Sequence, residues 1–241
     1  MSTPAFPGGT SVSRLTVYTG QCVDGLEGGT PHLHTASTEA YVVVGGRGAL
    51  QTLSRAGFAE TPLLPGTTVW FTPGTIHRAV NHGGLEVVVV MSNAGLPEAG
   101  DAVMTFPPEV VADPAAYQAA ATLPTAAASP AVEAAVAARR DLAVDGFLRI
   151  AAALREGDTA PLERFYAAAA ALVRPKVAGW RRLWERTVAQ EARRTAEVLD
   201  ALDRGDAGHL GEAALLAAPN GERWGMCGHL ITHDTAHPTR P

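Results

Sequence analysis

The sequence predicts a mainly β fold, an antiparallel barrel or sandwich, followed by an α-helical C-terminal region. Residues 12–92 contain short β-type runs separated by clusters of Gly and Pro, a spacing typical of antiparallel barrels. From residue 130 onward, apolar residues recur at three- and four-residue steps, which indicates helices. The 241 residues suffice for one large domain, or for one domain with a substantial extension.

Runs of β-forming residues define the predicted strands. They are Leu15–Thr19, Ala40–Val44, Ala49–Leu53, Thr67–Thr72 and Leu85–Met91. Prolines interrupt the chain after the last of these runs, and residues 123–130 have the composition of a linker. We therefore expect a β-barrel over residues 1–112, a linker over residues 113–130, and an α-helical extension with an irregular tail over residues 131–241.

Cap and stop residues delimit the predicted helices. Ser129 can cap a helix that starts at Pro130, and Gly157 ends its apolar pattern. A second helical stretch should run from residue 161 to residue 203, with a break near Pro175 and a stop at Gly205. A short helix is expected within residues 208–218.

Composition and charge exclude several classes of protein. The net charge of −5 gives no overall basic field for a nucleic acid or an anionic membrane surface. No apolar run approaches the length of a membrane-spanning helix. Only two cysteines occur, and the first ten residues lack the basic and apolar segments of a secretory leader, so we expect a cytoplasmic protein.

Two histidines and a glutamate stand together in the first chemically informative stretch, residues 29–46. Side chains alternate along a strand, so His32 and His34 project on the same face and can offer two imidazoles to one ion. Glu39 follows after a short polar turn and can return toward that ion along the next strand. A further ligand has to come from elsewhere in the chain.

The second informative stretch, residues 66–81, supplies that ligand. His77 comes just after a Pro73-Gly74 turn that joins two apolar strands. Three histidines and one carboxylate form a mixed nitrogen and oxygen set that suits one divalent transition metal: Fe, Mn, Ni, Cu, Co or Zn. Four protein ligands leave an octahedral ion two open positions, where a substrate with adjacent oxygens can chelate, or a substrate and O2 can bind side by side.

These two stretches resemble the paired histidine motifs of the cupin superfamily. The matching residues are His32, His34, Glu39 and Gly46 in the first motif, and Gly66, Gly74, His77 and Asn81 in the second. The resemblance covers roughly residues 28–92 and implies a cupin jelly-roll β-barrel with the metal inside. Thr72 stands where the motif usually has Pro, and this position is not a ligand.

Other side chains of the barrel region are candidates for contact with a substrate. Tyr41 shares strand parity with Glu39, so its hydroxyl can reach a substrate in the cavity, or its ring can simply fill the core. An anionic substrate would need Arg47, Arg55 or Arg78. Arg78 is adjacent to His77 and should face away from the metal, toward solvent or an interface.

Three functions fit this pattern. The first is a dioxygenase-type oxidoreductase acting on a small oxygenated substrate, with Glu39 and Tyr41 as candidate catalytic residues. The second is a metal-dependent sugar isomerase or epimerase, in which the ion stabilises an enediolate and no O2 is consumed. The third is a barrel that binds a small molecule without turnover.

We expect no nucleic-acid partner and no membrane partner, and we expect a homodimer. Barrels of the cupin superfamily often pair, and helices bearing Trp180 and Trp184 offer a packing face. The histidines near the C-terminus are four residues apart, but the intervening sequence disfavours a helix. We therefore expect this tail to pack on the barrel or to fray rather than to form a second metal site.

Overall fold

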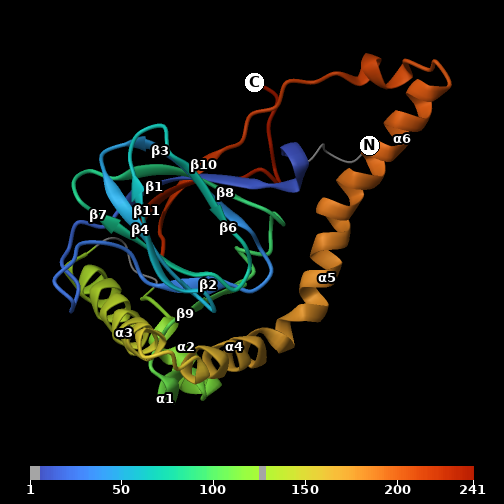
Figure 1. Cartoon of the computed structure of the whole chain (residues 1–241). Helices are drawn as coiled ribbons and strands as arrows, with labels where there is room; N and C mark the ends of the chain where they lie inside the picture. The colour runs from blue at the N-terminus through green and yellow to red at the C-terminus, as the bar shows by residue number, and fades with distance from the viewer. Residues whose placement is uncertain (1–5, 125–128) are drawn as a thin grey trace.

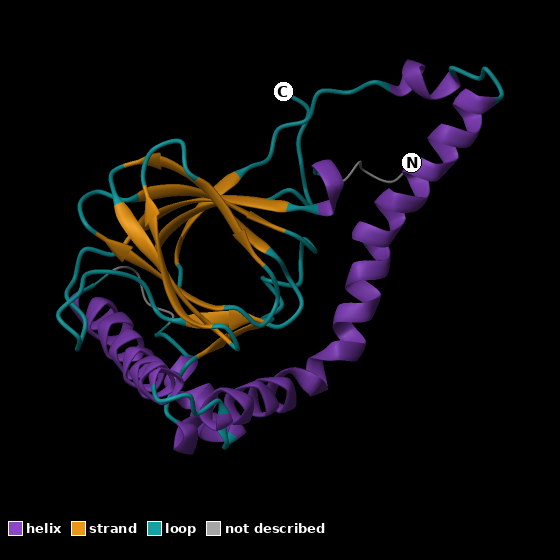
Figure 2. Cartoon of the chain, viewed as in Figure 1, coloured by secondary structure: helices purple, strands orange, loops and turns teal. Residues whose placement is uncertain are grey.

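The computed structural model describes residues 6–124 and 129–241. Two antiparallel sheets form a jelly-roll barrel among these residues, and helices cover one side of it (Figures 1 and 2). One sheet has the strand order β10-β11-β1-β8-β3-β6, and the other has the order β5-β4-β7-β2-β9. The predicted fold class, a barrel followed by an α-helical region, is confirmed.

The strands alternate between the two sheets along most of the chain. Their bounds are β1 (Ser11–Val17), β2 (His32–His34), β3 (Glu39–Gly45), β4 (Gly48–Ser54), β5 (Gly57–Leu63), β6 (Thr68–Phe71), β7 (Ile76–Asn81), β8 (Glu86–Met91), β9 (Ala102–Met104), β10 (Asn220–Trp224) and β11 (Gly228–His233). β7 lies in the middle of its sheet and all six of its residues are buried, because both of its faces are covered.

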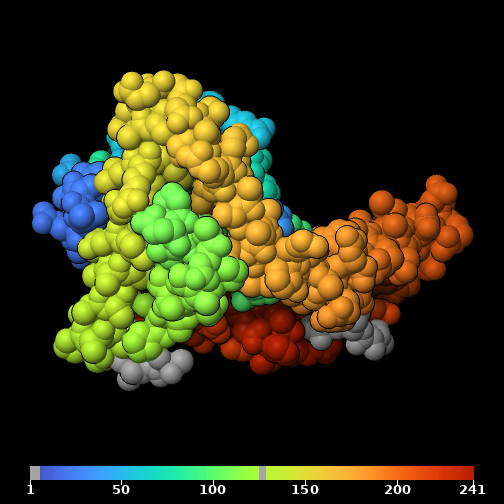
Figure 3. Space-filling model, turned by 90° about the horizontal axis from the view of Figure 1, so that it is seen from below, coloured from blue at the N-terminus to red at the C-terminus, as the bar shows by residue number. Residues whose placement is uncertain are grey.

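The helices follow the barrel strands and precede the last hairpin. They are α1 (Pro108–Val111), α2 (Pro114–Ala121), α3 (Pro130–Arg155), α4 (Ala160–Val173), α5 (Val177–Arg186) and α6 (Val188–Asp203), with 3-10 turns at Pro7–Gly9, Arg174–Lys176 and Gly208–Glu212. Seen from below, α1 to α4 cover the barrel, and α5 and α6 form an arm that extends beyond it (Figure 3). None of the helices in the described ranges is long and apolar enough to cross a membrane.

Two apolar cores hold these layers together. Tyr41, Leu85 and Val87 belong to the core inside the barrel. Leu33 and Ile76, on the outer face of the second sheet, pack with Phe147 of α3 in the other core. Gly146 lets α3 approach closely, since a Cβ at this position would overlap the carbonyl oxygen of Thr105. The helical region is thereby joined directly to the barrel.

The helix boundaries expected from capping residues are confirmed. The Ser129 hydroxyl accepts the N–H of Val132, and Pro130 opens α3. Gly157 follows the helix with φ of +79°, a left-handed conformation that glycine adopts without strain. The second helical stretch is interrupted at Arg174–Lys176, around the predicted Pro175 break.

The expected linker over residues 113–130 differs from the structure. Residues 114–121 form α2, whose start is capped by Asp113 through the N–H of Ala115. An Asp-Pro pair before an Ala-rich run is itself a helix start signal, and it outweighs the linker-like composition that follows. Residues 125–128 of the expected linker lie outside the described residues.

The C-terminal tail packs on the barrel, as one of the two expectations had it, but part of it is regular rather than irregular. Residues 220–224 and 228–233 form a hairpin whose second strand pairs with β1, from Ser13 opposite Thr232 to Val17 opposite Gly228. Gly228 permits this pairing, because a Cβ there would overlap the carbonyl oxygen of Thr16. The C-terminal hairpin therefore completes a barrel sheet that begins at residue 11.

Candidate metal centre

Three strands bring the four predicted ligand residues to one place inside the barrel. His32 and His34 lie on β2, Glu39 begins β3, and His77 lies on β7 directly opposite His32 in the register. One ligand atom from each of the four residues falls within 4.8 Å of the others, and all four residues are buried. The four side chains therefore lie together as expected, and their binding of an ion stays a prediction.

Backbone carbonyls fix the orientation of two imidazoles. Nδ1 of His32 lies 2.8 Å from the carbonyl oxygen of Thr30, and Nδ1 of His77 lies 3.1 Å from that of Thr75. A carbonyl oxygen only accepts hydrogen bonds, so each Nδ1 carries the proton and donates it. The Nε2 lone pairs are then free to face a shared ion, as in metal sites where the second ring nitrogen is hydrogen-bonded.

Asp101 orients the third imidazole, and no sequence pattern predicts a role for this residue. Its Oδ1 accepts from Nδ1 of His34 at 2.7 Å, and its Oδ2 accepts the N–H of Ser37 at 3.0 Å. Asp101 is fully buried in the segment between β8 and β9, far in sequence from both motifs. No spacing links it to the histidines, so only the fold identifies it.

Two buried polar atoms at the centre of the cluster lack hydrogen-bond partners. Oε2 of Glu39 lies 3.1 Å from Nε2 of both His34 and His77. With its proton on Nδ1, His77 has an acceptor at Nε2 that faces the acceptor Glu39 Oε2, so neither atom finds a hydrogen-bond donor in the other. Unsatisfied buried lone pairs are costly, and a cation between them would remove the cost. The residues present therefore fit a divalent ion with nitrogen and oxygen ligands.

The ionisable groups of the cluster shift one another's pKa values. Burial lowers the pKa of His32 well below 6.5, with contributions from His77 and His34. Burial also opposes protonation of His34, but its contacts with Asp101 and Glu39 outweigh burial and raise its pKa to about 10. The pKa of Glu39 is lowered. Burial alone would raise it, but the neighbouring His77 and His34 outweigh burial.

Comparison with known proteins agrees with this geometry. The family model described as "Cupin domain" matches residues 21–92, which include all four converging side chains. Residues 21–92 of the chain therefore form a cupin domain. No curated protein matches the chain.

Several solved cupin-fold structures are similar to part of the chain. The Streptomyces nucleoside dehydratase Pac13 is 19% identical over 38% of this chain and 62% of its own, with a TM-score of 0.28. KdgF from Halomonas sp. is 20% identical over 38% of this chain and 72% of its own, with a TM-score of 0.28. The DMSP lyase DddQ from Ruegeria pomeroyi is 19% identical over 34% of this chain and 38% of its own, with a TM-score of 0.26. The match spans less than two thirds of Pac13.

The cluster of four converging residues opens into a cavity of about 950 Å³. His32, His34, Glu39 and Tyr41 line it, together with residues of the C-terminal hairpin. The Tyr41 hydroxyl lies 3.9 Å from Sγ of Cys227, and the ring packs edge-on against Phe71. Burial beside Cys227 and Glu39 raises the pKa of Tyr41 well above 10, so the phenol keeps its proton. Tyr41 thus contacts both the cavity and the barrel core.

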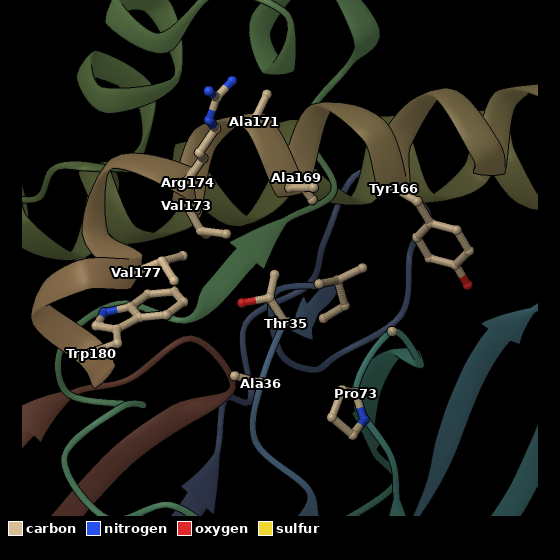
Figure 4. Close-up of a pocket in the computed structure, with 13 residues that line it drawn as sticks. Thr35, Ala36, Pro73, Tyr166, Ala169, Ala171, Val173, Arg174, Val177 and Trp180 are labelled. Atoms are coloured by element: carbon tan, nitrogen blue, oxygen red, sulfur yellow. The ribbon is translucent and has the colours of Figure 1, made fainter. Parts of the chain in front are cut away.

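A second hollow lies outside the cupin barrel and contains none of the four ligand residues. It has a volume of about 840 Å³ between α4, α5 and the turns at Thr35–Ala36 and Pro73–Gly74 (Figure 4). Leu33 lines this hollow. It stands between His32 and His34 on β2, so its side chain points to the opposite face of the strand. This hollow is separate from the metal centre.

The arginines expected to meet an anionic substrate lie elsewhere. Arg55 pairs with Glu163, and Arg47 donates to the carbonyl of His82. The solvent or interface role expected for Arg78 is wrong, because its side chain is fully buried with Nη1 2.6 Å from Oδ2 of Asp24. Arg78 does point away from the metal centre, but the loop that follows β1 covers that face of β7.

That loop and the C-terminal tail account for the remaining sequence features. Gly28 bridges to Val80, and the carbonyl of Glu27 accepts the N–H of Asn81, so the loop lies across β7. In the tail, His229 packs against Tyr18 and Trp224. The cluster at His32, His34, Glu39 and His77 is the only group of three or more potential ligands of its kind within the described part of the chain.

Proposed function

We propose that the chain binds one divalent transition metal through His32, His34, Glu39 and His77, and is an enzyme acting on a small oxygenated substrate. The observation that carries the proposal is the buried cluster itself, in which Glu39 Oε2 and His77 Nε2 have no hydrogen-bond partner. Burying polar atoms without partners lowers the stability of the folded protein unless a ligand binds to them. The cavity in front of it supplies room for a substrate.

A dioxygenase-type oxidoreductase is the activity we propose first. A redox-active ion in a mixed nitrogen and oxygen site would supply Lewis acidity and electron transfer toward O2. The chain's own residues have the remaining tasks. The four converging residues and Tyr41 are buried, and Tyr41 presents a protonated hydroxyl to the cavity. Glu39 can act as a base toward the substrate if its carboxylate leaves the ion.

The test is O2 uptake with catechols and other enolisable substrates by protein loaded with Fe(II), Ni(II), Mn(II) or Cu(II). We expect uptake to require the metal and to be abolished by Glu39→Ala and His77→Ala. Tyr41→Phe separates binding from chemistry, since it removes only the hydroxyl. Metal content should be measured for every variant, and a wild-type protein that retains no ion would contradict the proposal.

A sugar isomerase or epimerase is the second candidate. The pairing of a protonated phenol on Tyr41 with the carboxylate of Glu39 in one cavity supports it, because proton transfer at carbon needs an acid and a base. Under anaerobic conditions, this activity would exchange a carbon-bound hydrogen of the substrate with deuterium from the solvent. Exchange without O2 consumption would favour this function over the dioxygenase.

A homodimer remains our proposal for assembly. Trp184, Leu199 and Leu202 on the arm of α5 and α6 are 40%, 61% and 50% exposed, which leaves apolar surface available for a second copy. Trp180, one turn before Trp184, is instead buried, and its indole donates to the carbonyl of Ala99. Light scattering on the eluted protein should give the mass of two chains, and a mass of one chain at micromolar concentration would remove the proposal.

A further inference from the structure

A basic side chain reaches the cavity of the metal centre from the helical region. Arg139 belongs to α3 and lines the same cavity as His32, His34 and Glu39. Its Nη2 donates to the carbonyl oxygen of Gly225 at 3.2 Å, in the turn between β10 and β11. Cys227, two residues further along this turn, is the neighbour of the Tyr41 hydroxyl. Arg139 and the four converging residues therefore line one cavity. The turn between β10 and β11 contacts both Arg139 and Tyr41.

The guanidinium of Arg139 has no counter-ion among the described residues. Nη1 donates to the carbonyl of Ala121 at 3.4 Å, and Nε is buried without a hydrogen-bond partner. The Gly225 carbonyl that accepts from Nη2 also accepts from the Tyr18 hydroxyl at 2.9 Å. Burial lowers the pKa of Arg139, and the groups around it are neutral. A partly desolvated cation with only weak neutral acceptors favours an anion beside it.

The adjacent Arg140 also has a buried Nε without a hydrogen-bond partner, but its charge has partners that Arg139 lacks. Arg140 donates to the carbonyl of Gln21 at 2.8 Å, its Nε lies 3.8 Å from Asp141, and its guanidinium lies 5.9 Å from the centre of the Tyr18 ring. Arg140 thus has a carboxylate and an aromatic ring within the protein. Arg139 has neither, and it is Arg139 that lines the cavity.

The other charged groups of the cavity lie at its exposed rim. Arg186 and Arg223 are exposed to water, which solvates their charges. Of the rim carboxylates, Asp234 pairs with His237, and Glu98 accepts the N–H of Gly95. Among the described residues that line the cavity, Arg139 is the cation that is partly buried and has no anionic partner.

We propose that Arg139 binds a carboxylate group of the substrate, whose remaining oxygens face the metal centre. The inference rests on the proposed function and narrows its substrate class to small carboxylic acids. A guanidinium fork matches the planar carboxylate with two parallel hydrogen bonds, and the pairing is strong where water is excluded. The helical region then contributes substrate selection to a centre that the barrel strands build.

The test is calorimetric titration of metal-loaded protein with oxalate, malonate, succinate and glutarate, which vary the span between two carboxylates. We expect at least one of these acids to bind, and Arg139→Gln to weaken its binding by about 10-fold or more. Arg186→Gln, a matched change at the exposed rim of the same cavity, should change the affinity by less than about 3-fold. Arg139→Lys, which keeps the charge and loses the fork, should fall between.

Thermal unfolding separates ligand binding from a purely structural role of Arg139. The binding acid should raise the unfolding midpoint of the wild type and leave that of Arg139→Gln unchanged. The inference is overturned if no acid binds to the wild type, or if Arg139→Gln binds all four acids as tightly as the wild type.

Metal analysis keeps this failure distinct from failure of the proposed function. If the wild type holds an ion but Arg139→Gln has no effect, the inference alone fails. If the wild type holds no ion, the proposed function fails. Titration of the metal-free protein then still shows whether the same acid binds in an Arg139-dependent way.

Discussion

Asp101 holds the imidazole of His34 in place from behind, although it is not one of the four converging residues. Carboxylates in this position typically change metal affinity by about 10- to 100-fold when they are replaced. We therefore expect Asp101→Asn to lower the affinity for a divalent ion by that range. The amide nitrogen of Asn would have to face either the Nδ1–H of His34 or the N–H of Ser37, and both of these groups are donors. Competition titration with a chromophoric chelator measures the affinity.

Asp234→Asn is the matched control for this change. Asp234 lines the mouth of the same cavity but pairs with the exposed His237 instead of a residue of the metal centre. Its substitution should leave the metal affinity unchanged. Equal affinities for Asp101→Asn and the wild type would show that the backbone alone orients His34.

The ion pair between the half-buried Asp24 and the buried Arg78 gives a prediction for pH dependence. Burial alone would raise the pKa of Asp24, but its hydrogen bond to Arg78 and the charge of Arg78 lower it below 3.8. A carboxylate with a lowered pKa contributes stability above its ordinary range, and this is lost as the pH falls through the folded-state value. Asp24→Asn should cost about 3 kcal/mol at neutral pH, because it leaves the guanidinium buried and unpaired.

Urea unfolding of the wild type and Asp24→Asn between pH 7 and pH 3 measures this dependence. The difference in unfolding free energy should be constant near neutrality and shrink at the acid end. Asp145→Asn, which breaks an exposed pair with Arg149, should show little difference at any pH. A difference between wild type and Asp24→Asn that grows on acidification would contradict the assignment.

At the scale of residues, the sequence predicts the side chains that share a strand face and misses those that arrive from elsewhere. His32, His34, Glu39 and His77 could be brought together because strand parity and two spaced motifs place them. Asp101 and Arg139 come from a loop and a helix with no fixed spacing to the motifs. The burial of Arg78 was missed because alternation gives the direction of a side chain and not what covers it.

The contact between α3 and the barrel depends on one glycine. A Cβ at Gly146 would overlap the carbonyl oxygen of Thr105, which directly follows β9. Gly146→Ala therefore has to push α3 away from this segment. We expect a loss of about 1–3 kcal/mol of unfolding free energy, the usual cost of overpacking. Gly179→Ala in the exposed α5 meets only ordinary contacts and should stabilise by about 0.5–1 kcal/mol through helix propensity.

These two substitutions are identical in chemistry and both lie inside helices, so their opposite signs isolate the effect of close approach. Chemical denaturation monitored by tryptophan fluorescence and circular dichroism measures both. If Gly146→Ala stabilises as Gly179→Ala does, α3 can shift without loss of packing, and the helix is not firmly joined to the barrel.

At the scale of elements, capping residues made α3 predictable, whereas the C-terminal hairpin was not. Ser129, Pro130 and Gly157 act locally, so the sequence next to them determines where α3 begins and ends. The strand β11 is defined by its pairing with β1, more than two hundred residues earlier in the chain. The alternation of apolar and polar residues over residues 228–233 is too short to predict that pairing from the sequence alone.

At the scale of the whole molecule, barrel and extension depend on each other. β11 covers the edge of β1, and the Thr105 hydroxyl donates to the carbonyl of Ala143 in α3 at 2.8 Å. Phe147 of α3 packs in one core with Leu33 and Ile76 of the barrel. We therefore propose that residues 1–112 and the remaining chain unfold as one cooperative unit.

A chain ending at Ala112 tests this proposal. It would expose the edge of β1 and the outer apolar face of the second sheet, and an uncovered strand edge beside apolar surface favours aggregation. We expect this fragment to lack a cooperative thermal transition and to elute as aggregate. Co-expression with residues 113–241 should restore a soluble complex, since the missing strand and helices are then supplied in trans.

The outcome also decides where the metal centre gets its stability. All four converging residues lie within residues 1–112, so a fragment of that length that folds and binds one ion would show that the strands suffice. A fragment that fails alone and recovers both fold and metal binding with its complement would show the opposite. The helices and the C-terminal hairpin would then be part of the centre's structural support, because the turn carrying Cys227 closes the cavity beside Tyr41.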